Sequence, residues 1–495
     1  MLEYDFNSNR FMESLILNSK MESFKDKEAP VPTPSFADAK AEKRHIIKNL
    51  LIVSFAFLLL FTAFQSLSNL QSSLNRVGGL GVASLSVIYG ALIVSCLFVP
   101  PLVIDRLGCK WTIAASMSCY CAYIIANYYA TWATMIPTSI LLGFAAAPLW
   151  SAKCAYLTTS GIRYGELTKQ TGDAVVTRFF GIFFLIFQSG QIWGNLISSL
   201  VLQQKDDRNS SMINYGLCGA NDCPGTPVNG SSAADKTDGP DKKIITLMSI
   251  YLAVGILAVI LISTTLDKIT ILGSEKKNHG VFSLFIATAR HLKDRRMQLL
   301  IPLTMYSGLE QGFVYGDFTK SFVTCVLGVD KVGYVMICFG VTDAILSYAI
   351  GKLSEYTGRP VLMFSGAALN LGLMVGLLIW KPVPDDLPMF FVAAAMWGVA
   401  DSLWQTQVNA FYGYLFPDNQ EAAFSNYRLW ESLGFVIAFA YSGAICVSTK
   451  LYILIAVLIV AITFYGVIER MEHTKRKTMS YAPSMQAIER KEELS

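Results

Sequence analysis

Residues 302 to 359 read PLTMYSGLEQGFVYGDFTKSFVTCVLGVDKVGYVMICFGVTDAILSYAIGKLSEYTGR. This stretch contains two apolar segments, and each carries one acidic residue near its middle, Glu310 and Asp343. A short polar loop, from Gly351 to Arg359, closes the second segment. Each of these pieces has a counterpart elsewhere in the chain, so the stretch predicts a protein built from repeated apolar helices.

The composition identifies the broad class of protein. Hydrophobic residues make up 53% of the 495 residues and charged residues only 15%. A soluble chain of this length needs more charge to cover its surface. The net charge is +4, and the basic residues flank apolar runs, so they indicate membrane topology rather than nucleic-acid binding. The sequence therefore predicts an all-α polytopic membrane protein.

Apolar runs long enough to cross a bilayer, about 20 residues each, recur through the chain. Twelve are predicted, at 46–70, 81–104, 111–130, 134–157, 174–202, 244–266, 299–326, 332–351, 361–380, 388–412, 426–447 and 450–468. They form an N-terminal half (45–266) and a C-terminal half (299–468). A linker, 267–298, joins the halves, and its basic residues suit either a surface helix or an ordinary connection. The polar tails, 1–44 and 469–495, are expected to be disordered.

Two patterns predict the orientation. Basic residues are concentrated in the loops that lie on the same side as the N-terminus, as the positive-inside rule requires for the cytoplasmic side. The loop 203–243 falls on the opposite side and contains two N-x-[ST] glycosylation sequons, at Asn209 and Asn229. Both termini are therefore predicted to be cytoplasmic.

The ten cysteines divide into two groups. Eight lie in or beside apolar runs, including Cys325 and Cys446, and are interpreted as packed thiols. Cys218 and Cys223 share the outer 203–243 loop, where oxidising conditions favour a disulfide between them. The alternative is two free thiols.

Polar turns repeat between the two halves at a constant offset. The aligned pairs, 250 residues apart, are Asp105 with Glu355, Gly108 with Gly358, and Arg178 with Arg428. This spacing predicts a 6+6 parallel repeat.

The two polar turns resemble the G-x-L-a-D-r-x-G-r-k signature of the major facilitator superfamily. The first copy keeps Asp105, Arg106, Gly108 and Lys110, but has Pro101 in place of the leading glycine. The second keeps Gly351, Leu353, Gly358 and Arg359, with Glu355 aligned to Asp105. An acid at a helix end followed by basic residues can latch helices at the inner face, and the alternative is a tight glycine turn with topology charges.

Polar side chains lie at membrane depth. Glu310 is about eleven residues into its helix, roughly 16 Å and close to the midplane of a bilayer. Asp343 and Asp401 are placed similarly, and Asp401 forms a stripe with Gln405 and Asn409 at helical spacing. Carboxylates at this depth usually face the bundle interior or a water-filled cavity.

Further polar residues have two possible roles. Gln65 with Asn69, and Gln188 with Gln191 and Asn195, could line the same cavity or bond helices together. Two pairs of charged residues and one lysine are expected to find local partners or solvent. Asp317 should pair with Lys320, Arg428 with Glu431, and Lys153 should reach the inner interface.

Long polar-aromatic strings inside the predicted helices carry a second resemblance. They include LLLFTAFQSLSNLQSSLN (58–75), YSGLEQGFVYGDFTKSFV (306–323) and DSLWQTQVNAFYGYLF (401–416). Together they resemble the unc-93 family over roughly 46 to 470. The resemblance implies a major-facilitator-like fold and an accessory role for another membrane protein, a two-pore-domain potassium channel or a receptor. It also implies a place in the cell membrane, or alternatively in the endosomal or endoplasmic reticulum membrane.

Two functions remain open at this point. The first is regulation of a partner membrane protein, and the second is secondary transport of a small cation or organic solute by Glu310, Asp343 and Asp401. The sequence contains no metal-ligand pair, P-loop or nucleophile motif, so no cofactor and no enzymatic activity are predicted.

Overall fold

The computed structural model describes residues 36–170, 172–203, 214–224, 242–269, 286, 289–416 and 420–492. In these residues the chain is helical. The long elements are α2 (Phe36–Leu74), α3 (Leu80–Ala126), α4 (Trp132–Thr168), α5 (Gly172–Leu202), α6 (Lys242–Thr265), α8 (Arg295–Phe313), η6 (Val314–Thr324), α9 (Val329–Thr357), α10 (Arg359–Ile379), α11 (Leu387–Leu415), α12 (Gln420–Ser442) and α13 (Val447–Glu492). Short 3₁₀ turns connect several of them, including η1 (Val77–Gly79), η4 (Tyr215–Leu217) and η5 (Gly219–Asn221).

Two glycines divide the chain in the same way in both halves. Gly108 interrupts α3 with φ 71° and ψ 166°. Gly358, at the aligned position, separates α9 from α10 with φ 78° and ψ 152°. Side chains other than glycine rarely adopt such positive φ values, so each turn requires its glycine. When α3 is divided at Gly108 and η6 is joined to α8, the described residues form twelve long helical segments.

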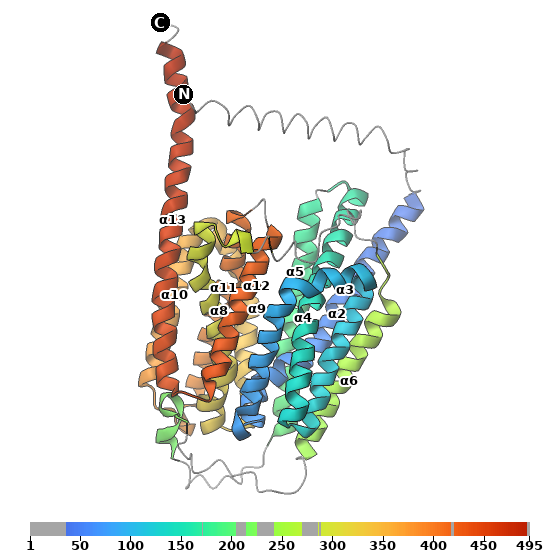
Figure 1. Ribbon diagram of the computed structural model, residues 1–495, viewed down its shortest axis with the longest axis vertical. Helices are drawn as coiled ribbons and strands as arrows, with labels where there is room; N and C mark the ends of the chain where they lie inside the picture. Colours follow the sequence, from blue (N-terminus) through green and yellow to red (C-terminus); the bar gives the residue numbers. More distant parts are fainter. Residues whose placement is uncertain are drawn as a thin grey trace.

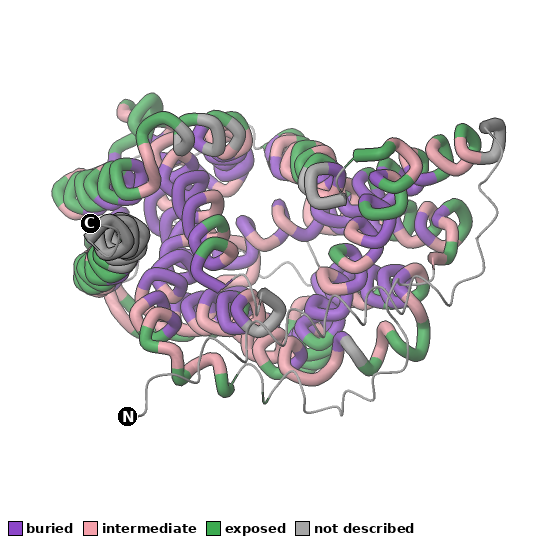
Figure 2. Tube along the Cα trace, turned by 90° about the horizontal axis from the view of Figure 1, so that it is seen from above, coloured by how far each residue is buried: buried purple, intermediate pink, exposed green. Residues whose placement is uncertain are grey.

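The helices assemble into two halves that lie against each other (Figure 1). In the first half α3 packs on α4, and α2 on α5 and α6, while in the second α9 packs on α11, and α8 on α12 and α13. The halves meet mainly where α5 packs on α9 and α3 packs on α12. Buried residues concentrate inside each half and along this seam (Figure 2).

Small residues allow the two halves to approach closely. A Cβ at Gly333 of α9 would clash with the backbone oxygen of Asn195 in α5, and one at Gly340 would press on Gln191. Small residues at helix contacts are the usual way for membrane helices to pack, since lipid gives no hydrophobic drive between them.

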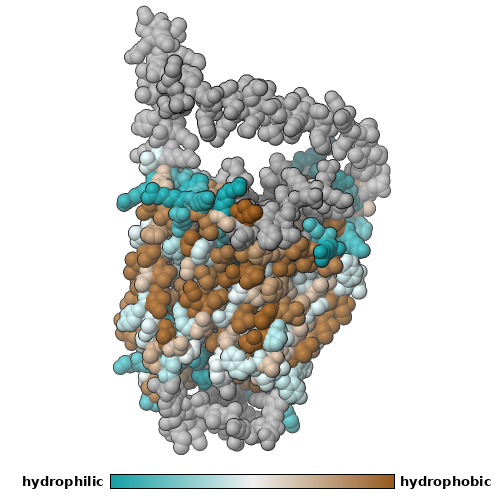
Figure 3. Space-filling view, viewed as in Figure 1, coloured by the Kyte–Doolittle hydropathy of each residue, from teal (hydrophilic) through white to brown (hydrophobic). Residues whose placement is uncertain are grey.

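Apolar side chains form a broad band across the middle of the face shown in Figure 3. Eight helices in the described residues are long and apolar enough to cross a membrane. Exposed apolar side chains such as Leu185 (75%) and Ile379 (74%) belong against lipid rather than water. The protein is therefore an all-helical membrane protein embedded in a lipid bilayer.

Both ends of the described chain lie at one end of the bundle, and η4 and η5 lie at the other (Figure 1). We name these the inner and outer ends, following the orientation predicted from the basic residues. Asn209 and Asn229 lie outside the described residues, as do most of the inner linker and the N-terminal tail up to residue 35.

The tails differ from expectation where the structure describes them. α2 already begins at Phe36, inside the segment expected to be disordered, and α13 continues unbroken to Glu492. Both extensions prolong a membrane helix, so hydrogen bonding propagates from an already formed turn into the polar sequence beyond it.

Candidate functional site

Glu310 lies in α8 and is almost completely buried, with 1% of its surface exposed. Among the described residues neither of its carboxylate oxygens has a hydrogen bond of good geometry, although the Asn370 side chain interacts with the carboxyl group. A buried carboxylate without such a bond is costly and marks a functional position in a membrane helix. Its helix is held close to α12 at a point where Gly308 faces the carbonyl oxygen of Glu431.

This close approach gives a first prediction. Gly308→Ala should lower the free energy of unfolding by about 1–3 kcal/mol, because the added methyl group meets backbone that cannot move aside. Gly372→Ala is the matched control, since a Cβ there meets nothing within 4 Å. Thermal unfolding of the purified variants measures both, and equal midpoints would contradict the tight α8–α12 contact.

Asp343 of α9 lies at the seam between the two halves. Its carboxylate accepts a hydrogen bond from the Gln188 amide of α5 at 3.4 Å, and one from the Ser347 hydroxyl at 3.2 Å. The first bond crosses from one half to the other. Asp343 therefore lies where the two halves contact each other.

Asp401 of α11 is the third predicted acid, and the structure places it near the other two. Its surface is 6% exposed and its Oδ1 atom has no hydrogen-bond partner. The carboxylates of Asp343, Glu310 and Glu431 are close enough to interact with it electrostatically. Carboxylates from α8, α9, α11 and α12 thus gather in the C-terminal half, and we name these four residues the acidic cluster.

Glu431 was not among the site residues predicted from sequence, although its bridge to Arg428 was predicted. The structure contains that bridge, at 2.8 Å. Glu431 also accepts hydrogen bonds from Tyr427, at 2.8 Å, and from Gln405, at 3.4 Å. Among the described residues, Glu431 is therefore the one acid of the cluster that forms an ion pair, and its partner is Arg428.

Arg428 faces the other half of the protein. Its side chain is 54% exposed although α12 lies inside the bundle. Its charge interacts with Lys153 and Cys154 of α4, across the seam. An exposed guanidinium at membrane depth belongs in water rather than in lipid.

Lys153 does not reach the inner interface as expected. It is 2% exposed, and its Nζ atom lies between four aromatic rings. The distances from Nζ to the ring centroids are 4.5 to 5.1 Å, and the rings are those of Trp150, Phe180, Phe183 and Phe184. Cation–π attraction to these rings offsets part of the cost of burying its charge.

The predicted pair of Asp317 and Lys320 is wrong. Asp317 instead bonds Lys450, 133 residues away, at 2.7 Å, and accepts a hydrogen bond from Ser442 at 2.7 Å. Lys320 lies 4.0 Å from Asp222. The reason is that residues 314–324 form a π-helix, whose wider i→i+5 turn moves positions three apart off a common face.

The predicted amide stripes have different roles. Asn69 of α2 donates to Asn195 at 3.1 Å and to Gln191 at 3.5 Å, and all three are buried. These amides therefore join α2 to α5 by hydrogen bonds, which is the second of the two roles considered for them, rather than lining a cavity. Gln65 lies on the same helix with its Oε1 atom unpartnered.

The inner-face turns differ in their contacts. Arg359 of the second copy lies 3.7 Å from Glu469 of α13 and stacks over Phe411 at 4.3 Å. Asp105 and Arg106 of the first copy are exposed, and Lys110 lies over Trp111. The backbone of Gly351 and Glu355 is part of α9, and the side chain of Glu355 is not among those the structure describes.

The predicted disulfide between Cys218 and Cys223 is also wrong. Cys218 is bonded to Cys325, and Cys223 to Cys446. Both partners were interpreted as packed thiols, but they lie at the outer ends of their helices. The outer loop of the N-terminal half is therefore joined covalently to the C-terminal half.

No group of three His, Cys, Asp or Glu side chains is close enough to hold a metal ion in the residues that the structure describes. The four carboxylates of the acidic cluster are therefore not arranged as a metal site in this part of the chain.

Comparisons with solved structures agree with the fold. The nucleoside transporter NupG superposes with a TM-score of 0.59 at 16% identity, covering 85% of this chain and 98% of that one. The xylose transporter XylE from E. coli gives 0.56 at 11% identity, with coverage of 85% and 97%. These similarities show a major-facilitator-like fold.

Comparisons of sequence show the family. The chain is 57% identical to protein unc-93 homolog A of Xenopus laevis over 87% of this chain and 95% of the relative, and 49% identical to the Homo sapiens protein over 88% and 96%. It is 39% identical to the putative potassium channel regulatory protein unc-93 of Caenorhabditis elegans, over 87% of this chain and 62% of that one. The model for the ion channel regulatory protein UNC-93 matches residues 78–465. The chain therefore belongs to the UNC-93 family.

Proposed function

We propose that this protein is a regulatory partner of another membrane protein, and that the partner is a potassium channel of the two-pore-domain type. The family match carries the proposal, since the family description names ion channel regulation and the Caenorhabditis elegans relative is named for potassium channels. We place the protein in the cell membrane, with twelve spanning helices in two parallel repeats of six and both termini in the cytoplasm.

The acidic cluster supports this function in a specific way. Glu310, Asp343 and Asp401 have no ion-pair partner among the described residues, and Asp343 is bonded across the seam. A change of charge there would alter the contact between the halves. A change in that contact would in turn alter the helix surface that a partner protein binds.

A second candidate function is secondary transport of a small cation or organic solute. The transporters NupG and XylE share the fold, and three buried carboxylates lie near the seam where a solute would cross. Arg428 is also exposed between the halves. The two functions differ in whether the purified protein moves anything by itself.

Reconstitution into liposomes separates the two. As a regulator, the purified protein should give no uptake of potassium, sodium or organic cations above empty liposomes. Robust uptake that Glu310→Gln abolishes would contradict the regulatory proposal and support transport. Gln311→Ala is the control, because Gln311 is the next residue in α8 and its amide donates a local hydrogen bond to Ser307.

Proximity labelling in cells tests the partner directly. A labelling enzyme fused to the C-terminus should reproducibly mark a potassium channel more strongly than the same enzyme on an unrelated multi-pass protein. If no channel is enriched in repeated surveys, the proposed partner class is wrong.

A further inference from the structure

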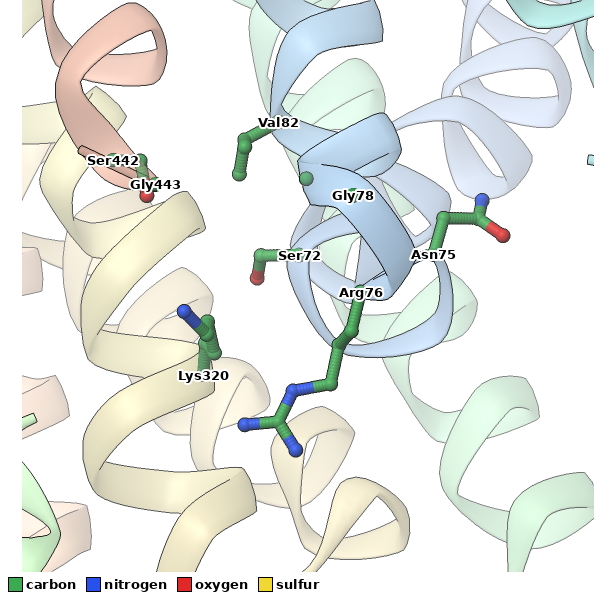
Figure 4. A pocket seen from close by; sticks show the side chains of 9 residues that line it. Ser72, Asn75, Arg76, Gly78, Val82, Lys320, Ser442 and Gly443 are labelled. Atoms are coloured by element: carbon green, nitrogen blue, oxygen red, sulfur yellow. The ribbon is translucent and has the colours of Figure 1, made fainter. Parts of the chain in front are cut away.

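A small cavity lies at the outer end of the seam between the two halves. Its volume is about 220 Å³. One wall comes from the end of α2, η1 and the start of α3, and the other from η6 and the end of α12 (Figure 4). Drug-sized ligands need about 300 Å³ or more, so this cavity fits a small ion with some water.

Two basic side chains line the cavity from opposite halves. Arg76 follows α2 in the N-terminal half, and Lys320 belongs to η6 in the C-terminal half (Figure 4). The guanidinium of Arg76 has no carboxylate partner among the described residues. Lys320 has one at 4.0 Å, the limit of an ion pair, and its side chain is 25% exposed.

The charges near the cavity leave a positive excess. Lys450 is fully engaged with Asp317, and its Nζ atom also donates to the Ser442 carbonyl at 2.6 Å. The carboxylate of Asp222 accepts the Ser321 hydroxyl at 2.6 Å as well as attracting Lys320. Among the described residues three cations thus face two carboxylates, and the uncompensated charge is that of Arg76.

Polar groups suited to an oxyanion complete the lining. Ser72 contributes a hydroxyl, and η1 contributes two successive glycines, Gly78 and Gly79, with φ of 61° and 73°. Glycine with positive φ exposes the backbone at close range, as in turns that approach anions. Guanidinium and ammonium groups bind carboxylate and phosphate oxygens with strong, charge-assisted hydrogen bonds.

We propose that this cavity binds a small oxyanion, a phosphate or carboxylate group, that bridges Arg76 and Lys320 and holds the outer ends of the two halves together. Two disulfides tie the outer loop to the C-terminal half, but the neighbouring hydrogen bonds between α2 and η6 are weak by comparison. They are hydroxyl pairs, Ser72 with Thr319 at 3.4 Å and Ser73 with Thr324 at 2.8 Å. Without the anion, the positive charges of Arg76 and Lys320 repel each other across the seam. With the anion bound, both are attracted to the same negative group. This proposal holds whether the protein regulates a channel or transports a solute.

Thermal unfolding of the purified protein in nanodiscs of zwitterionic lipid tests the site. Inorganic phosphate should raise the unfolding midpoint by about 2–4 °C over sodium chloride of equal ionic strength. Arg76→Gln and Lys320→Gln should each weaken the apparent affinity for phosphate by about tenfold or more. Arg76→Lys should restore part of it, which separates loss of charge from misfolding.

Matched controls make the outcome decisive. Lys331→Gln also removes an outer-end lysine, but Lys331 pairs with Asp330 and does not line the cavity, so it should leave the phosphate effect unchanged. Stabilisation in anionic-lipid nanodiscs without phosphate, lost in the same two variants, would identify a lipid headgroup as the source of the oxyanion. No phosphate or lipid effect in the wild type, or an effect lost in only one of the two variants, would overturn the bridging site.

Discussion

Lys450→Met is expected to lower the free energy of unfolding by about 3–5 kcal/mol, enough to prevent accumulation of folded protein. Lys450 and Asp317 are both buried, at 1% and 0% exposure, and their charged atoms are 2.7 Å apart. Removing the lysine leaves a carboxylate inside the C-terminal half with only the Ser442 hydroxyl to solvate it. The pair joins η6 to α13, so its loss loosens the outer end of that half.

Fluorescence-detected size exclusion after heating measures this effect. The double variant Asp317→Asn with Lys450→Met should recover much of the loss, because the buried charge is removed together with its partner. Lys331→Met, which removes a lysine that is 43% exposed, should change the midpoint little. A single Lys450→Met variant as stable as wild type would show that the buried pair does not form.

Loss of the outer disulfides is the second large effect expected. Replacing Cys218 and Cys325 together by serine should lower the free energy of unfolding by about 2–5 kcal/mol, since the bond closes a long loop in the unfolded chain. The paired cysteines are 107 residues apart in one bond and 223 in the other. Reducing agent breaks both bonds, so it should produce a larger shift than this in wild type, and a smaller one in the double variant, where only the Cys223–Cys446 bond remains.

Peptide mapping under non-reducing conditions identifies the pairing itself. It should recover fragments joining Cys218 to Cys325 and Cys223 to Cys446. Cys154→Ser is the control for thiol loss, because Cys154 is a free, exposed cysteine. A fragment joining Cys218 to Cys223 would contradict the structure and support the pairing first inferred from their shared loop.

Local periodicity allowed much of the fold to be predicted. The apolar runs indicated the helices, and the 250-residue offset indicated the two turns that Gly108 and Gly358 make with the same backbone conformation. Helix length and glycine conformation depend on neighbouring residues, so sequence patterns report them well.

Pairings between distant segments could not be predicted in the same way. Cys325 and Cys446 flank apolar runs and resemble packed thiols, because nothing local says which outer loop will meet them. Asp317 and Lys320 have the spacing of an α-helical pair, but the π-helical turn redirects Asp317 to Lys450. In both cases the contact is decided by how helices from different parts of the chain are arranged.

The candidate site could be predicted only in part. Glu310, Asp343 and Asp401 were singled out by depth alone, and their gathering with Glu431 required the packing of α8, α9, α11 and α12. The 250-residue offset had pointed to Arg428 but not to its carboxylate partner as a site residue. Asn69, with the same depth signal, instead joins α2 to α5.

The most direct measurement of the central claim is the potassium current of two-pore-domain channels co-expressed with this protein. For at least one channel in the panel, we predict a reproducible change in current or surface abundance relative to co-expression with an unrelated multi-pass protein. Asp401→Asn, which removes one of the four carboxylates of the acidic cluster, should reduce that change while the protein remains at the membrane. Unchanged current and surface abundance across the whole panel, with this protein verified at the cell surface, would contradict the account.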